Sequence, residues 1–222
     1  MEKGKYIVFF DLDGTLISVN SGYALVKEAR RRKMITPVEI ARALCLSVLY
    51  KLKVFSAGNV IKSMGKWLKG TDHSLFRQVA ISATERYLVS TVYPEALDEI
   101  KLHREKKATI VLLTSAVAEI AEYITENLGL DACVSTVMES HNGTLTGNPM
   151  GEYCYGTEKE KRLLEFCRIN GYEPSDSFCY ADASSDLPAL LASGHPVCVN
   201  PDRKLRRTAI NKGWPVRDWK KG

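Results

Sequence analysis

The sequence predicts an α/β fold: a doubly wound, mostly parallel sheet with an all-helical segment inserted after the first strand. Short apolar runs typical of buried strands alternate with amphipathic helical segments through residues 93–212. Residues 18–92 contain no convincing strand and are patterned as successive helices. We therefore expect a core domain of residues 1–17 and 93–222, and a helical cap domain of residues 18–92.

Composition agrees with a globular protein of the cytoplasm. The 222 residues are long enough to bury a full core, and 45% are hydrophobic. No apolar run approaches the length of a membrane span, and the longest candidate, residues 43–50, is far too short. The N-terminal segment lacks the features of a secretory signal. Six scattered cysteines without metal-ligand spacing indicate free thiols in a reducing compartment.

The first strand and the cap come first along the chain. Residues 6–10, YIVFF, are β-branched or aromatic throughout and predict a buried strand. Four helices are expected in the cap, over residues 21–33, 37–53, 60–68 and 74–88. The second of them carries an apolar stripe, for which we expect contact with protein. Contact with a membrane surface is the alternative.

The β/α rhythm of the core then follows in order. A helix begins near Pro94, and Asn142-Gly143 is a strong hairpin signal. The other expected elements are strands over 109–113, 133–138, 177–181 and 197–200, and helices over 117–127, 158–170, 186–192 and 205–212.

Polar side chains gather where these strands end, and parallel sheets bind ligands at that edge. They are Asp11 and Asp13 after the first strand, Thr114 and Ser115 after the second, Asp182 and Asp186 after the strand over 177–181, and Lys159 or Lys161 from the preceding helix. Clustered carboxylates suit Mg²⁺. Hydroxyls and the turn at Gly14 suit an anion. Together these groups predict a phosphoryl site.

The same residues resemble the haloacid dehalogenase-like superfamily. Its motifs appear in order as Asp11-Leu12-Asp13-Gly14-Thr15-Leu16, then Thr114, a lysine, and an acidic pair at Asp182 and Asp186. The finer resemblance is to subfamily IB, the phosphoserine-phosphatase-like hydrolases, carried by strings such as YPEALDEIKLHREKKATIVLLTSA and DLPALLASGHPVCVNPDRKLRRTA. The variants Ser115-Ala116 and Asp182-Ala183 depart from the usual motifs.

The resemblance implies a role for each residue. Asp11 is the nucleophile that forms an aspartyl-phosphate, and Asp13 is the general acid and base. Mg²⁺ is held by Asp11, Asp182 and the backbone carbonyl of Asp13, and Asp186 orients the metal's water or the lysine. Thr114, Ser115 and Gly14 bind the substrate phosphate. Lys159 fits the family spacing, together with Gly156 and Leu163. Lys161 would lie about 200° round the helix, on the opposite face.

We therefore expect a Mg²⁺-dependent phosphatase acting on a small, phosphoserine-like phosphorylated metabolite. A phosphotransferase, a lipid-phosphate phosphatase and a non-catalytic phosphate-binding module are the alternatives. The net charge of +5 is concentrated in residues 27–33 and in the C-terminal tail. We expect both to be solvated helix faces, with no nucleic-acid partner. The oligomeric state is left open by the sequence.

Overall fold

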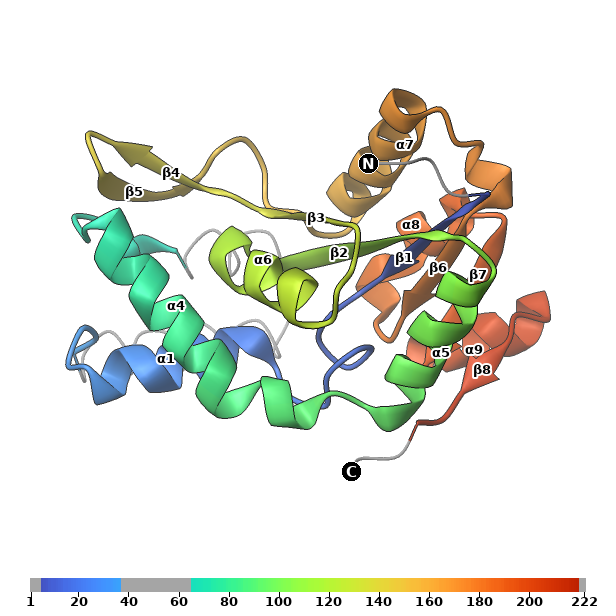
Figure 1. Ribbon diagram of the computed structural model, residues 1–222, viewed down its shortest axis with the longest axis horizontal. Helices are drawn as coiled ribbons and strands as arrows, with labels where there is room; N and C mark the ends of the chain where they lie inside the picture. The colour runs from blue at the N-terminus through green and yellow to red at the C-terminus, as the bar shows by residue number, and fades with distance from the viewer. Residues whose placement is uncertain (1–4, 37–64, 220–222) are drawn as a thin grey trace.

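A six-stranded parallel sheet forms the centre of the protein, as a computed structural model of residues 5–36 and 65–219 shows (Figure 1). The strand order is β3-β2-β1-β6-β7-β8. The strands are β1 (Ile7–Phe10), β2 (Thr109–Val117), β3 (Ala132–Thr136), β6 (Phe178–Ala181), β7 (His195–Val199) and β8 (Val216–Arg217). The predicted α/β fold with a parallel sheet is confirmed.

Helices cover both faces of this sheet, because alternate residues of its strands point to opposite sides. Val8 and Phe10 belong to one apolar cluster, together with residues of α5 (Pro94–Glu105) and α6 (Ala118–Asn127). Ile7 and Phe9 belong to a second cluster. That cluster includes residues of α7 (Thr157–Asn170), α8 (Leu187–Ala192) and α9 (Arg203–Lys212). All four strand residues are fully buried, as the unbroken apolar run predicts.

The strand order fixes where a ligand can bind. From β1 the chain moves outward to β2 and β3 on one side, and later returns to β6 on the other side of β1. The carboxyl ends of β1 and β6 therefore flank the point where the order reverses, and open α/β sheets bind their ligands there. Asp11 and Asp182 directly follow these two strands.

Beside the sheet lie α1 (Ser21–Arg31), a short 3-10 helix (Lys66–Leu68) and α4 (His73–Tyr87) (Figure 1). The carboxylate of Glu28 is fully buried where α1 meets α4, and it accepts hydrogen bonds from Arg31, Arg32 and Ser82. The expected helix over 37–53, and most of that over 60–68, lie outside the described residues. The division into cap and core stays a prediction.

The predicted hairpin is present, as β4 (Met138–His141) and β5 (Thr144–Pro149). Asn142 and Gly143 between them both have positive φ, as a tight hairpin turn requires. Several expectations differ from the structure. β2 continues to Val117 instead of ending at residue 113, β3 and β4 replace a single strand over 133–138, and β8 was not predicted.

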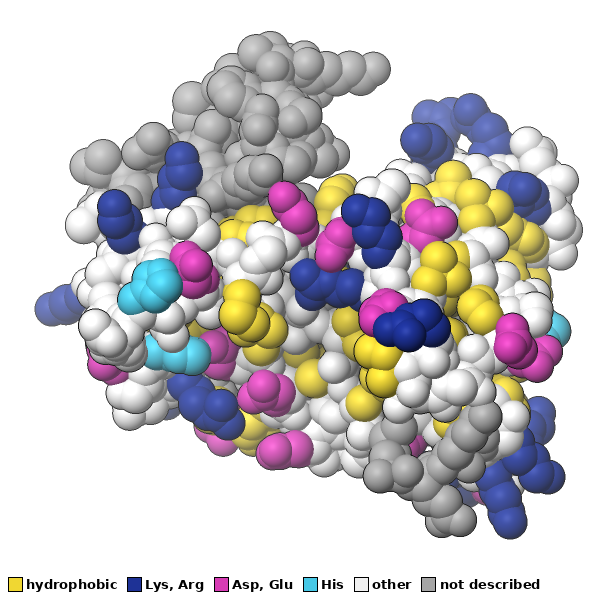
Figure 2. Space-filling view, turned by 90° about the horizontal axis from the view of Figure 1, so that it is seen from above, with side chains coloured by type: hydrophobic (Ala, Val, Ile, Leu, Met, Phe, Trp, Pro, Cys, Tyr) yellow, Lys and Arg dark blue, Asp and Glu magenta, His cyan; other side chains and the backbone are white. Residues whose placement is uncertain are grey.

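The surface is mixed in character. Figure 2 shows Lys, Arg, Asp and Glu side chains distributed among apolar ones over the middle of one face. None of the helices in the described parts of the chain combines the length and the apolarity that a membrane crossing requires.

Candidate active site

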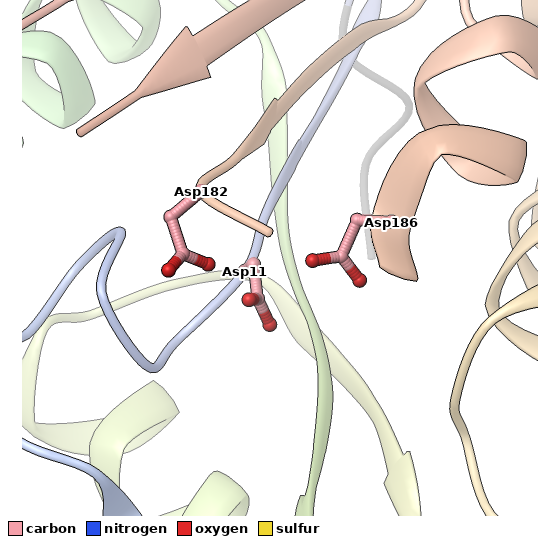
Figure 3. Close-up of side chains that lie close together, drawn as sticks. All are labelled: Asp11, Asp182 and Asp186. Carbon is pink, nitrogen blue, oxygen red and sulfur yellow. The ribbon is translucent and has the colours of Figure 1, made fainter. Parts of the chain in front are cut away.

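Three carboxylates converge at the carboxyl edge of the sheet (Figure 3). Asp11 follows β1, Asp182 follows β6, and Asp186 immediately precedes α8. One oxygen from each lies within 4.8 Å of one from each of the others. Asp11 and Asp186 are buried and Asp182 is half-buried. Like charges this close are unfavourable unless a cation is shared among them.

Lys159 supplies one such cation. Its Nζ donates hydrogen bonds to Oδ1 of Asp11 and to Oδ1 of Asp186, each 2.7 Å long. Burial alone would lower the pKa of the Lys159 ammonium, but the two carboxylates outweigh burial and hold that pKa well above its ordinary value. Lys161 lies on the surface instead, with 74% of its side chain exposed and Nζ 3.6 Å from Glu158. Helix spacing separates the two lysines in this way.

The remaining carboxylate charge fits a divalent cation. Burial, and then the charges of Asp11 and Asp186, raise the pKa of Asp182 to about 8. Burial also raises the pKa of Asp11 to about 7, although Lys159 opposes it. Carboxyls with such values are only partly ionised at neutral pH, and a bound divalent cation would restore their charge. An all-oxygen donor set of this kind suits Mg²⁺.

Asp13 is held separately, at the start of α1. Its Oδ1 accepts a hydrogen bond from the backbone N–H of Ser21 at 2.8 Å. Its Oδ2 accepts from Oγ of Ser21 at 2.9 Å and from Nδ2 of Asn20 at 3.1 Å. Burial raises the pKa of Asp13, and the hydrogen bonds from Ser21 oppose that shift. The sequence places Asn20 and Ser21 at a helix start, a common position for such side chains, but does not reveal that they fix Asp13.

Gly14 serves this site through its lack of a side chain. It has a φ of +78°, and a Cβ there would lie 2.2 Å from Oδ2 of Asp182. Its backbone N–H donates to the carbonyl of Ile17 at 2.8 Å. This amide is therefore bonded within the turn, and phosphate binding at Gly14 stays a prediction. The structure also shows that Gly14 leaves room for Asp182.

Thr114 and Ser115 differ in exposure. They lie within β2 and not beyond its end, where pairing with β3 changes register between Leu113 and Val117. Thr114 is buried, and its Oγ1 accepts from the backbone N–H of Ala116 at 3.1 Å. Ser115 is exposed and lines the same cavity as Asp13.

The loop after β6 has a support that sequence reasoning missed. Asp202 begins α9, where its Oδ1 accepts from the backbone N–H groups of Lys204 and Leu205. Its Oδ2 accepts from the backbone N–H of Ser184 at 2.6 Å, and its own N–H donates to the carbonyl of Asp182 at 2.8 Å. Asp202 therefore ties the acidic loop to a helix. An Asp before a helix is an N-cap signal, but this second contact has no sequence signature.

A family model described as haloacid dehalogenase-like hydrolase matches residues 8–191. The chain belongs to this family. The matched segment contains every residue of the acidic site, from Asp11 to Asp186. The family was expected from the ordered motifs, and that expectation is confirmed.

Relatives and solved structures agree with this assignment. The chain is 31% identical over 220 residues to the "inhibition of morphological differentiation protein" of Streptomyces azureus, which covers 95% of this chain and 77% of that protein. It is 24% identical over 216 residues to phosphoserine phosphatase SerB1 of Mycobacterium tuberculosis, and the match covers 96% of this chain and 70% of SerB1. The structure of a phospho-aspartyl intermediate analogue of phosphoserine phosphatase has the same fold, with a TM-score of 0.71 at 17% identity, covering 99% and 95% of the two chains. The prediction of a phosphoserine-phosphatase-like enzyme of this family is confirmed.

Proposed function

We propose that this enzyme is a Mg²⁺-dependent phosphomonoester hydrolase that transfers the phosphoryl group of a small substrate first to Asp11 and then to water. The observation that carries the proposal is the ion-pair network at the carboxyl edge of the sheet. There Lys159 bridges Asp11 and Asp186 at 2.7 Å, and Asp182 lies within 4.8 Å of both carboxylates.

In the first step an oxygen of Asp11 attacks phosphorus, and the bond from phosphorus to the alcohol oxygen breaks. Lys159 opposes the effect of burial on the pKa of Asp11 and orients its carboxylate for this attack. Asp13 gives its proton to the departing alkoxide. When bound to Asp11, Asp182 and the Asp13 carbonyl, Mg²⁺ would supply charge neutralisation for the phosphoryl oxygens.

In the second step Asp13 takes a proton from water, which attacks phosphorus and releases inorganic phosphate from Asp11. The raised pKa of Asp13 suits a group that must both give and accept a proton. Ser21 and Asn20 hold its carboxylate in one orientation for both steps. The buried hydroxyl of Thr114 and the exposed hydroxyl of Ser115 are our candidates for contacts with the phosphoryl oxygens.

Hydrolysis is preferred to the alternatives for a specific reason. A non-catalytic binding module would not need a buried lysine bonded to two carboxylates. Transfer to a second alcohol uses the same first step, and analysis of products with an added acceptor separates it from hydrolysis. The five described cysteines are free and four of them are buried, which supports the cytoplasm as the compartment of this enzyme.

The test is phosphate release by the wild type and by Asp11→Asn, with and without Mg²⁺. We expect the wild type to need Mg²⁺ and Asp11→Asn to lose turnover while its urea unfolding curve stays cooperative, because an amide cannot attack phosphorus. Beryllium fluoride should inhibit the wild type and raise its melting temperature in the presence of Mg²⁺. Undiminished turnover by Asp11→Asn, or by the wild type in excess chelator, would contradict the proposal.

A further inference from the structure

A cavity of about 250 Å³ opens beside Asp13 and Ser115. Residues of α1, the 65–68 turn, the end of β2, α6 and the 153–155 segment surround it. Because Asp13 protonates the leaving alcohol in the proposed reaction, this cavity lies on the leaving-group side of the site.

The lining is apolar away from that end. Leu25, Val26, Trp67 and Ile120 are aliphatic or aromatic, and ten of the sixteen described lining residues are aliphatic, aromatic or Met. The polar side chains nearest Asp13 already have a hydrogen-bond partner, since Asn20 and Ser21 both donate to its carboxylate. Among the described lining residues, Asp13 is the only carboxylate, and none is Lys, Arg or His.

We propose that this cavity takes an apolar alcohol portion of the substrate, so that the preferred phosphomonoesters carry an aromatic ring or a short alkyl chain and not an amino acid. The inference rests on the proposed function, because it assigns the group that Asp13 releases. The ammonium and carboxylate of phosphoserine would lose water here without a charged partner among the described residues, and such burial is costly. An apolar group would gain from the same burial.

The size of the cavity limits the alcohol. A dry apolar cavity of about 150 Å³ holds benzene. The cavity beside Asp13, at about 250 Å³, has room for one ring with a few further carbons or for an alkyl chain of similar bulk.

The experiment compares ethyl, propyl, butyl, pentyl and hexyl phosphate with phosphoserine, with released phosphate as the readout. These alkyl alcohols have similar acidity, so differences in rate report burial of the chain and not leaving-group chemistry. We expect kcat/KM to rise about two- to fourfold per methylene, the upper value being the full burial of one CH₂. Hexyl phosphate should then exceed phosphoserine by at least tenfold. A flat alkyl series, or preference for phosphoserine, would overturn the inference while leaving the hydrolase intact.

A binding measurement keeps the test independent of turnover. Alkylphosphonates of the same chain lengths cannot be hydrolysed, and calorimetric titration with Mg²⁺ present should give a Kd that falls about two- to fourfold per methylene. If no ester releases phosphate, the proposed function fails, and the phosphonate series still supports or overturns an apolar ligand for the cavity by its slope.

Two matched variants test whether the alkyl chain binds in this cavity. Val26→Thr replaces a methyl group by a hydroxyl on the cavity wall with little change of shape. We expect it to reduce the hexyl-to-ethyl ratio of kcat/KM at least threefold. Val216→Thr makes the same change at a half-buried position in β8, outside the cavity, and should leave the ratio unchanged. An equal ratio in Val26→Thr and the wild type, for both kcat/KM and phosphonate Kd, would place the chain elsewhere and contradict the inference.

Discussion

Replacing Lys159 by Met removes the cation that bridges Asp11 and Asp186 and keeps most of the side-chain volume. Two charge-assisted hydrogen bonds of 2.7 Å are lost within a buried site. Breaking a buried pair from one side costs about 3–5 kcal/mol when the remaining charge stays. Here the cost is smaller, because protonation of one carboxyl relieves the repulsion between Asp11 and Asp186. We therefore expect the free energy of unfolding to fall by about 2–4 kcal/mol at pH 7.5.

Activity should fall much further than in a surface variant. Loss of a group that orients the nucleophile and stabilises transition-state charge costs on the order of 10²- to 10³-fold in kcat. The matched control is Lys161→Met, whose ammonium is exposed and 3.6 Å from Glu158. It should change stability by less than about 0.5 kcal/mol and turnover by less than about twofold. The assay is steady-state phosphate release with urea unfolding of both variants. Loss of activity in Lys161→Met, with activity kept in Lys159→Met, would show that Lys159 is not the lysine of the site.

Two further predictions concern the backbone and pH. Gly14→Ala should lose activity and bind Mg²⁺ more than tenfold more weakly in calorimetry, because its Cβ would lie 2.2 Å from Oδ2 of Asp182. Gly143→Ala, at a similar positive φ with open space around it, is the control and should keep wild-type Mg²⁺ affinity. His103 is buried between the hydroxyls of Tyr6 and Tyr180, and burial lowers its pKa from 6.5 to about 4. Its stabilising contribution is therefore complete above pH 6.5 and lost as the pH falls toward 4, by about 3 kcal/mol in all. Urea unfolding from pH 7 to 4.5 should show a shallower loss for His103→Gln than for the wild type, and equal slopes would contradict this assignment.

Much of the fold was predictable because its signals are local. The apolar run of residues 6–10 indicates a strand buried on both faces, and Asn142-Gly143 favours a tight hairpin turn; β1 and the β4–β5 hairpin confirm both. β8 has only two residues and no apolar run, so it is defined by pairing with β7 and not by its own sequence. The extension of β2 to Val117 likewise depends on its neighbour β3.

The sequence predicted which residues lie together at this edge of the sheet, but not the contacts that each of them makes. Parallel strands bring their carboxyl ends together, so Asp11, Asp182 and Asp186 could be grouped before their distances were known. The family spacing, together with helix periodicity, favoured Lys159 over Lys161, and Lys159 is the lysine that contacts Asp11. The hydrogen bonds that hold Asp13, and the bond from the Gly14 amide to the carbonyl of Ile17, depend on tertiary geometry that residue spacing does not reveal.

Charge runs were the least informative feature. The basic run of residues 27–33 predicted a solvated helix face, and Arg31 and Arg32 are indeed exposed. The same run contains Glu28, whose buried carboxylate joins both arginines to Ser82 across α1 and α4. Hydrogen bonds from Arg31, Arg32 and Ser82 lower the pKa of Glu28 to about 2, with the bond from Arg31 the largest cause, although burial opposes them. A pattern of charges cannot reveal such a contact, because its partner lies 54 residues away.

In the proposed reaction two carboxylates have separate roles, since Asp11 attacks phosphorus and Asp13 moves protons. The most direct measurement is a rapid-mix trace of Asp13→Asn with p-nitrophenyl phosphate, followed by the intact mass of the quenched protein. p-Nitrophenolate leaves without protonation, whereas attack by water on the phosphorylated Asp11 needs a base. We expect a burst of about one nitrophenolate per site, then a stall, with a phosphoryl adduct on the protein. Steady turnover near the wild-type rate, with no burst and no adduct, would contradict the account.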